Sequence, residues 1–375
     1  MTHSIKFYPV GNGDCSQIIL SNGKRLLFDF CHRRKSEDVE DPRIDLHRIL
    51  SAELSAAKKS GFDVVALTHL DDDHIANSTE FFYLEHAKKY QQGDRTTIDE
   101  LWVPAATILE KGLSGEAAIW RREARHRLIA GKGIRVFSKP SALKDWLESN
   151  GLSLSSREHL ITDAGQLVPG FTLADDGVEF FVHSPFAKHS EGELVLRNES
   201  ALILHATFMV SDTKTRYLLV GDSTWEILEE IVDITSVKGN EERLYWDIYN
   251  VPHHCSYLAL GPEKGKTQTD PVENVQWLLD QCQSGAIAVS SSEPIPKEDT
   301  IDPPHRQAAA TYEQAIQKNG GSKFVVTMEH PNEKKPKVLE VEISRWGAKL
   351  LILSSVGSAS MTKSRSTRAG SHGLV

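Results

Sequence analysis

Apolar and polar positions first alternate with the two-residue period of strands. Residues 4–10, 16–20 and 25–30 show this alternation, with turn signals at Gly11-Asn12-Gly13 and Asn22-Gly23 between them. From residue 42 onward, helical stretches alternate with short apolar runs rich in branched residues, which are typical of buried strands. The pattern predicts an α/β protein that opens with a β-meander.

The alternation continues to about residue 353 without an internal repeat or a clear linker, so we expect one domain over residues 1–353. Residues 105–170 are predominantly helical and are interpreted as an inserted cap over the site. Residues 354–375 are rich in Ser, Gly and Thr, lack acidic residues and predict a disordered tail. Further helices are predicted over 42–59, 79–90, 224–234, 271–283 and 305–318, and further strands over 62–67, 98–103, 178–182, 201–209, 217–222, 245–251 and 286–290, before three closing strands.

Composition is ordinary for a soluble globular protein, with 375 residues, 39% hydrophobic and 25% charged, and a net charge of -9. The acidic balance argues against non-specific nucleic-acid binding by the whole surface. No membrane-spanning run or signal peptide is evident, so we expect a cytoplasmic protein without membrane contact. The four cysteines lie far apart and indicate neither disulfides nor a thiolate zinc site.

Candidate chemistry is concentrated where the strand over residues 62–67 ends. His69, Asp71, Asp73 and His74 follow it within a few residues, and the ends of buried strands are where α/β proteins place ligand sites. Alternating side chains would let His69 and Asp71 hold one cation and Asp73 and His74 another, with Asp72 facing away. An acidic helix N-cap is the simpler alternative, but it explains one Asp and neither His.

Two further strands end in the same way, on Asp222 and on His253-His254. Imidazole and carboxylate ligands suit zinc, manganese or iron. The three strand ends together predict a metal site built from distant parts of the chain.

These motifs resemble the metallo-β-lactamase superfamily, and most closely the hydrolase domain of the DNA-uptake protein ComEC and its soluble relatives. The HxDxDH motif over residues 69–74 replaces the superfamily's HxHxDH. Residues 10–14 (VGNGD), 197–204 (RNESALIL), 219–222 (LVGD) and 253–256 (HHCS) are similar to that group's VGQGD, NNNSLVL, LTGD and HHGS segments, in the same order. The resemblance implies a four-layer αβ/βα metallo-β-lactamase sandwich, here with a helical insertion.

The resemblance also implies roles for single residues. The first metal would be held by His69, Asp71 and Asn198, which stands where other members have a third His. The second metal would be held by Asp73, His74 and His254, and Asp222 would bridge the two ions. His253 would contact the substrate, and His183 is a rival third ligand of the first metal.

Two divalent ions with a bridging hydroxide suit the hydrolysis of phosphodiester bonds. We therefore expect a metal-dependent phosphodiesterase, most specifically a nuclease acting on DNA or RNA, with Asp73 orienting the attacking water and His253 or His305 assisting. The carboxylate of Asp71 favours Mn²⁺ or Mg²⁺ over Zn²⁺ at the first position, and Mn²⁺ is the preferred cofactor, with Zn²⁺ or Mg²⁺ as alternatives. His305, at a predicted helix start, is a candidate for binding phosphate oxygens.

Arg121 and Arg125 belong to a basic cluster that could track substrate phosphates; an ordinary solvated helix face is the alternative. Two other functions stay open: hydrolysis of a lactone, thioester or β-lactam, and a metal-stabilised module that docks a protein partner through the cap or the C-terminal tail.

Overall fold

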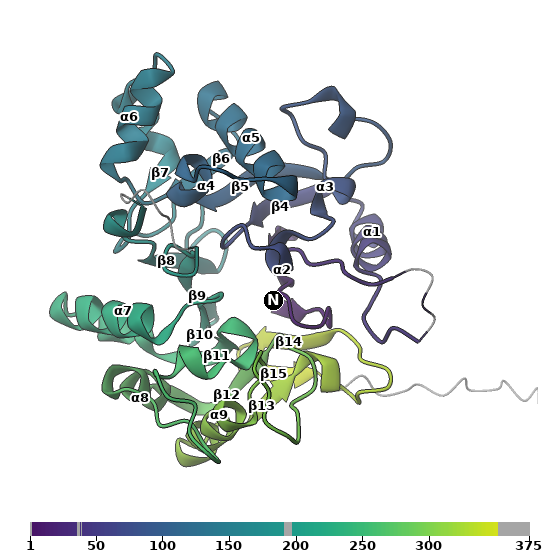
Figure 1. Cartoon of the computed structure of the whole chain (residues 1–375), viewed down its shortest axis with the longest axis vertical. Helices are drawn as coiled ribbons and strands as arrows, with labels where there is room; N and C mark the ends of the chain where they lie inside the picture. Colours follow the sequence, from purple (N-terminus) through teal and green to yellow (C-terminus); the bar gives the residue numbers. More distant parts are fainter. Residues whose placement is uncertain (1, 36–37, 39, 191–196, 352–375) are drawn as a thin grey trace, which may run out of the picture.

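The computed structural model describes residues 2–35, 38, 40–190 and 197–351, so the predicted tail at 354–375 lies outside the described residues. Two β-sheets form the centre of the molecule, with helices on their outer sides (Figure 1). The first sheet has the order β15 (Gly347–Leu351), β14 (Leu339–Ser344), β1 (His3–Phe7), β2 (Ser16–Ile19), β3 (Arg25–Phe28), β4 (Gly61–Ala66), β5 (Thr97–Pro104), β6 (Ile134–Phe137) and β7 (Ile161–Thr162).

The second sheet has six strands and is parallel on one side and antiparallel on the other. β10 pairs in parallel with β11, whereas β9 pairs antiparallel with both β8 and β10. Its order is β13 (Lys323–Val326), β12 (Cys282–Ser290), β11 (Trp246–Val251), β10 (Thr213–Leu219), β9 (Ile203–Val210) and β8 (Val178–Ser184).

The strand alternation explains why the sheets stack. In β4 and β5, Val64 and Trp102 belong to the core between the sheets, whereas their neighbours Val65 and Leu101 belong to the core under the outer helices. The ring of Trp102 meets Phe180 of the opposite sheet edge-on, at a centroid distance of 5.6 Å. Both faces of each sheet are therefore apolar and covered.

The outer helices complete the four layers. α1 (Leu46–Ala56), α5 (Gly115–Ala130) and α6 (Ser141–Ser149) pack on the first sheet, and α7 (Trp225–Val237), α8 (Glu273–Asp280) and α9 (Arg306–Lys318) pack on the second (Figure 1). This is the α/β fold and the αβ/βα sandwich expected from the resemblance. The shorter helices are α2 (Asp72–Ile75), α3 (Ser78–Phe81), α4 (Ala105–Leu109) and the 3-10 turns η1 (Lys88–Tyr90), η2 (Leu154–Ser156), η3 (Glu158–Leu160), η4 (Ala187–Ser190), η5 (Glu241–Leu244), η6 (His253–Cys255), η7 (Tyr257–Ala259) and η8 (Thr327–Glu329).

The expectation that residues 105–170 form a helical cap needs correction. β6 pairs in parallel with β5, and β7 pairs with β6, so the segment extends the first sheet. Trp120 and Leu128 of α5 are fully buried in the core on the outer face of that sheet. The strands are only four and two residues long, too short to stand out from the helical pattern around them.

The single helix predicted over residues 79–90 is also wrong. α3 ends at Phe81, and Phe82 takes an extended conformation and forms a bridge with Thr96. Phe82 and Leu84 are fully buried, so tertiary packing draws this stretch alongside the sheet.

None of the described helices is long and apolar enough to span a bilayer. All four cysteines are buried and free.

Candidate metal centre

Loops from both sheets meet at the rim of the sandwich and bring the predicted ligands together. Residues 68–74 follow β4, Asp222 follows β10, and His253 and His254 follow β11. Backbone hydrogen bonds join these loops: the amide of His253 donates to the carbonyl of Gly221 (3.1 Å), and that of Leu202 donates to Thr68 (3.0 Å). The fold thus fixes side chains far apart in the sequence at one end of the strands.

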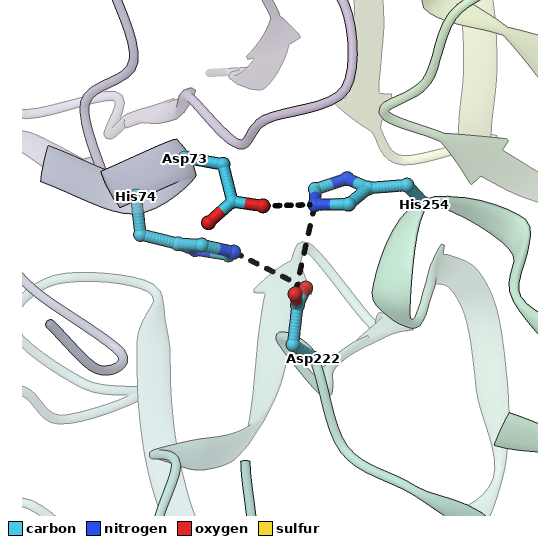
Figure 2. Close-up of side chains that lie close together, drawn as sticks. All are labelled: Asp73, His74, Asp222 and His254. Carbon is cyan, nitrogen blue, oxygen red and sulfur yellow. Dashed lines mark hydrogen bonds and ion pairs between the residues drawn. The ribbon is translucent and has the colours of Figure 1, made fainter. Parts of the chain in front are cut away.

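Four of these side chains form a compact cluster of Asp73, His74, Asp222 and His254 (Figure 2). Nε2 of His254 lies 3.2 Å from Oδ2 of Asp73 and 3.6 Å from Oδ2 of Asp222, and Nε2 of His74 lies 3.2 Å from Oδ1 of Asp222. The four ligand atoms lie within 4.8 Å of one another. Two imidazoles and two carboxylates that converge in this way suit one divalent cation.

Both imidazoles of the cluster are oriented by a bond on their far side. Nδ1 of His74 donates to Oδ2 of Asp29 (2.9 Å), and Nδ1 of His254 donates to the carbonyl of Ser291 (2.8 Å). The Nε2 atoms therefore face the cluster, where a bound cation would replace their protons, as in carboxylate–histidine–metal arrangements. Asp29 is itself held by the backbone amide and the hydroxyl of Thr68, both at 2.7 Å.

Two buried atoms of the cluster, Nε2 of His74 and Oδ1 of Asp222, lie 3.2 Å apart but make no hydrogen bond with each other or with another described residue. Unpaired buried polar atoms are rare in folded proteins and call for an explanation. A bound cation would give both atoms a partner, so the residues present fit a metal ion.

The electrostatics of the cluster also favour a cation. Burial by itself would raise the pKa of Asp222, but His254 and His74 outweigh it and hold that pKa well below its usual range. Burial would lower the pKa of His74, but the carboxylates of Asp222 and Asp29 raise it well above the usual value. The negative potential of several buried carboxylates is thus concentrated on this point.

The loop that carries the last ligand is strained. His253, His254 and Cys255 have φ angles of 50°, 51° and 66°, in the left-handed region that non-glycine residues seldom adopt. Strained backbone is often found at functional sites. Cys255, which stands where the resembling family has Gly, points into the buried core under the outer helices.

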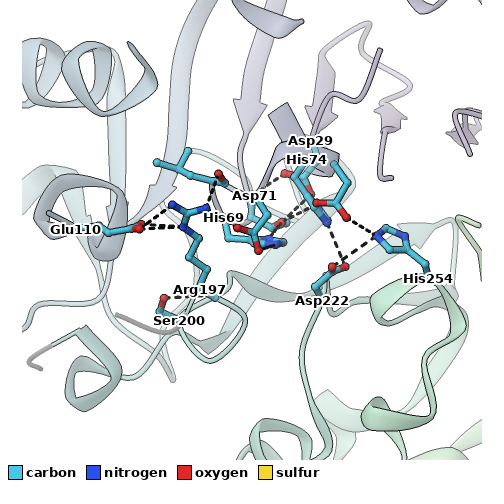
Figure 3. Close-up of polar contacts among 12 residues, drawn as sticks. Asp29, His69, Asp71, His74, Glu110, Arg197, Ser200, Asp222 and His254 are labelled. Atoms are coloured by element: carbon cyan, nitrogen blue, oxygen red, sulfur yellow. Dashed lines mark hydrogen bonds and ion pairs between the residues drawn. The ribbon is translucent and has the colours of Figure 1, made fainter. Parts of the chain in front are cut away.

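The predicted first metal position has a different arrangement. His69 and Asp71 do lie together, with Nε2 of His69 3.4 Å from Oδ2 of Asp71. The other carboxylate oxygen of Asp71 accepts a hydrogen bond from Arg197, which also pairs with Glu110 (Figure 3). In the described part of the chain, no further His, Cys, Asp or Glu joins His69 and Asp71 in a ligand cluster.

Asn198, the predicted third ligand, has a buried side-chain oxygen that accepts no hydrogen bond from any described residue. His183, its rival, is excluded as a ligand because both ring nitrogens are used. Nε2 donates to the carbonyl of Arg243 (2.9 Å), and Nδ1 lies 3.3 Å from the hydroxyl of Thr235.

The predicted substrate contacts of Arg121 and Arg125 need correction. Arg121 donates to the carbonyl of Glu110 (2.6 Å), and Arg125 donates twice to that of Ile108 (2.6 and 2.9 Å). Both guanidinium groups therefore cap the carboxyl end of α4. The sequence showed their charge but not these partners.

His305 also has a structural position. Its Nε2 donates to the carbonyl of Ile301 (3.1 Å), its Nδ1 accepts from the amide of Tyr257 (3.4 Å), and its own amide donates to Cys255 (3.0 Å). The ring thus supports the strained loop and has no free nitrogen for a phosphate oxygen. His253, in contrast, is half-buried, and its Nδ1 has no partner among the described residues.

Sequence reasoning missed several residues of this centre. Asp14 and Asp29 are buried beside His74. Asp14 ends the VGNGD motif and Asp29 directly follows β3, so their positions were the available signal. Arg197 and Glu110 had no such signal except that Arg197 precedes Asn198. Asp72, expected to face away, is exposed and pairs with Arg33.

No family model matches the chain, and no curated protein matches it. Among solved structures, it is similar to unliganded yeast PDE1, with 11% identity, a TM-score of 0.44 and coverage of 87% of this chain and 97% of that one. It is also similar to the metallo-β-lactamase GOB-18 from Elizabethkingia meningoseptica (12%, 0.31, 84% and 86%). A third match is a putative metal-dependent hydrolase from Parabacteroides distasonis (10%, 0.32, 85% and 91%).

Proposed function

We propose that this protein is a metal-dependent hydrolase of phosphodiester bonds, of the ComEC type, that acts on DNA or RNA. The observation that carries the proposal is the cluster of Asp73, His74, Asp222 and His254 with its oriented imidazoles. The resemblance of the motifs to the ComEC hydrolase domain supplies the substrate class.

A divalent cation held by these four residues would lower the pKa of water and stabilise charge on a phosphoryl oxygen. Asp73 is the most exposed ligand of the cluster, at 26%, compared with 4% or less for the other three. Its carboxylate lies on the open side and is placed to orient the attacking water.

His253 is the second residue to which we assign a part in the reaction. Burial lowers the pKa of its imidazole, so the ring is neutral at pH 7. The ring is half-buried, and its exposed part can contact an oxygen of the substrate without adding charge to the site.

The charge balance suits an anionic substrate. Asp73 and Asp222 together neutralise one divalent cation, so a phosphodiester meets no net repulsion from the loaded cluster. Mn²⁺ is our preferred ion and Zn²⁺ or Mg²⁺ the alternatives, because two imidazoles and two carboxylates form a mixed ligand set. A second ion bridged by Asp222 is what the resemblance implies.

The test is hydrolysis of bis(p-nitrophenyl) phosphate with Mn²⁺, Zn²⁺ or Mg²⁺, compared with the uncharged ester p-nitrophenyl acetate. Asp73→Asn is the variant, and Asp72→Asn is the matched control because Asp72 is adjacent but exposed and paired with Arg33. We expect the diester to be cleaved by wild type and by Asp72→Asn but not by Asp73→Asn. Faster cleavage of the acetate with no diester cleavage would refute the proposal.

A further inference from the structure

We propose that the guanidinium of Arg197 takes the place of the first metal ion, so that each chain binds one divalent cation, in the cluster of Asp73, His74, Asp222 and His254. The inference rests on the proposed function only in assuming that this cluster binds metal. It revises the expectation of two ions.

The contacts of Arg197 are extensive for a half-buried side chain. Its Nε donates to both carboxylate oxygens of Glu110 at 3.0 Å, and its Nη2 donates to Oε1 at 2.8 Å. Its Nη1 donates to Oδ1 of Asp71 and to the carbonyl of Leu70, at 3.1 Å from the latter. The guanidinium of Arg197 thus connects the carboxyl end of α4 with the HxDxDH motif over residues 69–74.

Asp71 lies between the guanidinium of Arg197 and the imidazole of His69. One oxygen accepts from Arg197, and the other faces Nε2 of His69 at 3.4 Å. The negative charge of Asp71 is therefore already paired with the fixed positive charge of Arg197.

A divalent ion at this position would meet three obstacles. It would have to share Asp71 with the guanidinium, whose positive charge repels it. The remaining donors would be the imidazole of His69 and, as the resemblance implies, the amide of Asn198, and an amide is a weak ligand. The described residues add no further His, Cys, Asp or Glu to this group, so the ion would depend on Asp71 for its carboxylate.

A guanidinium in this place also has a chemical use. An arginine has five N–H donors, and four are engaged in the contacts of the described residues, which leaves one on Nη2. That donor can bind a charged oxygen of a phosphodiester beside the single ion. Unlike a metal ion, this positive charge cannot dissociate.

The experiment measures the stoichiometry of Mn²⁺ bound to the purified full chain by equilibrium dialysis and elemental analysis. Electron paramagnetic resonance of the same samples separates an isolated Mn²⁺ from a spin-coupled pair. Wild type, Arg197→Ser and Arg197→Lys are compared. Arg243→Ser is the matched control, because Arg243 is similarly half-buried and pairs with Glu179 in the second sheet.

We expect one isolated Mn²⁺ per chain in wild type, in Arg197→Lys, which keeps the charge, and in Arg243→Ser. Arg197→Ser frees Asp71 to join His69 and Asn198, so a second, coupled Mn²⁺ should bind. Two ions in wild type overturn the inference, as does a folded Arg197→Ser protein that still binds one. If Arg197→Ser does not fold, the wild-type stoichiometry and spectrum decide.

The outcomes also separate this inference from the proposed function. One ion in wild type without diester hydrolysis refutes the proposed function and leaves the inference standing. No bound ion in wild type refutes both.

Discussion

Two groups of ligand-type residues lie side by side in this centre and have different surroundings (Figure 3). Asp73, His74, Asp222 and His254 face one another, with their imidazoles oriented by Asp29 and Ser291. His69 and Asp71 meet a guanidinium instead. The comparison teaches that residue types make a metal site possible, and that neighbouring charges decide whether an ion is held there.

The largest expected difference is between two variants, each of which loses one carboxylate. Asp222→Ala should lose bound Mn²⁺ and reduce diester hydrolysis by more than about 100-fold, because Asp222 would contact the ion directly, and loss of a residue that only supports a ligand already costs about 10–100-fold. Asp71→Ala should keep one ion, because Asp71 pairs with Arg197. Elemental analysis and hydrolysis rates check this, and equal metal loss in both variants would contradict the distinction.

A smaller effect on metal affinity is expected when Asp29, which supports His74 from outside the cluster, is replaced. Asp29→Asn keeps the shape of the side chain but weakens the bond that orients His74. Metal affinity should fall by about 10–100-fold, as measured by isothermal titration of the metal-free protein with Mn²⁺. Ser155→Ala, a change at an exposed hydroxyl outside the centre, is the control, and an unchanged affinity for Asp29→Asn would show that His74 needs no such support.

The histidines of the centre can be contrasted with His183, whose two ring nitrogens are both used inside the fold. Burial lowers its pKa to about 4. Since this value lies below the ordinary 6.5, the unfolded chain binds the proton first, and stability should fall as pH drops from 6.5 towards 4.

The decrease in the free energy of unfolding attributable to His183 is about 3 kcal/mol at most, from 1.36 kcal/mol per pKa unit. Urea unfolding of wild type and His183→Gln between pH 4 and pH 7 measures it. The variant should show a shallower decline while binding the same amount of metal. An equal slope in both proteins would mean that His183 does not carry this pH dependence.

The smallest effect is expected for Arg125→Ala. Loss of its bonds to the carbonyl of Ile108 should lower the free energy of unfolding by about 1 kcal/mol. KM and kcat for the diester should not change, because the guanidinium caps α4. A KM raised several-fold, with kcat unchanged, would return Arg125 to the substrate-binding surface.

The sequence by itself determined most of the strands, though not β6 and β7, and the position of the candidate ligands at strand ends. Alternation in residues 4–10 and 16–20 reflects side chains that point to opposite faces of a strand, which is a local property. The candidate ligands Asp73, His74, Asp222 and His254 each follow a strand of the sandwich, so their meeting could be expected from the ends of the strands.

Only the tertiary structure decided which charges meet. Arg197 lies 126 residues from Asp71 and 87 from Glu110, and no local pattern encodes such pairings. Packing likewise turned residues 105–170 into part of the first sheet and its outer layer, and assigned Arg125 to a helix end. The physical reason is that the two-residue period of a strand depends on residues adjacent in the sequence. Desolvation and ion pairing depend instead on every group that the fold brings within a few ångströms.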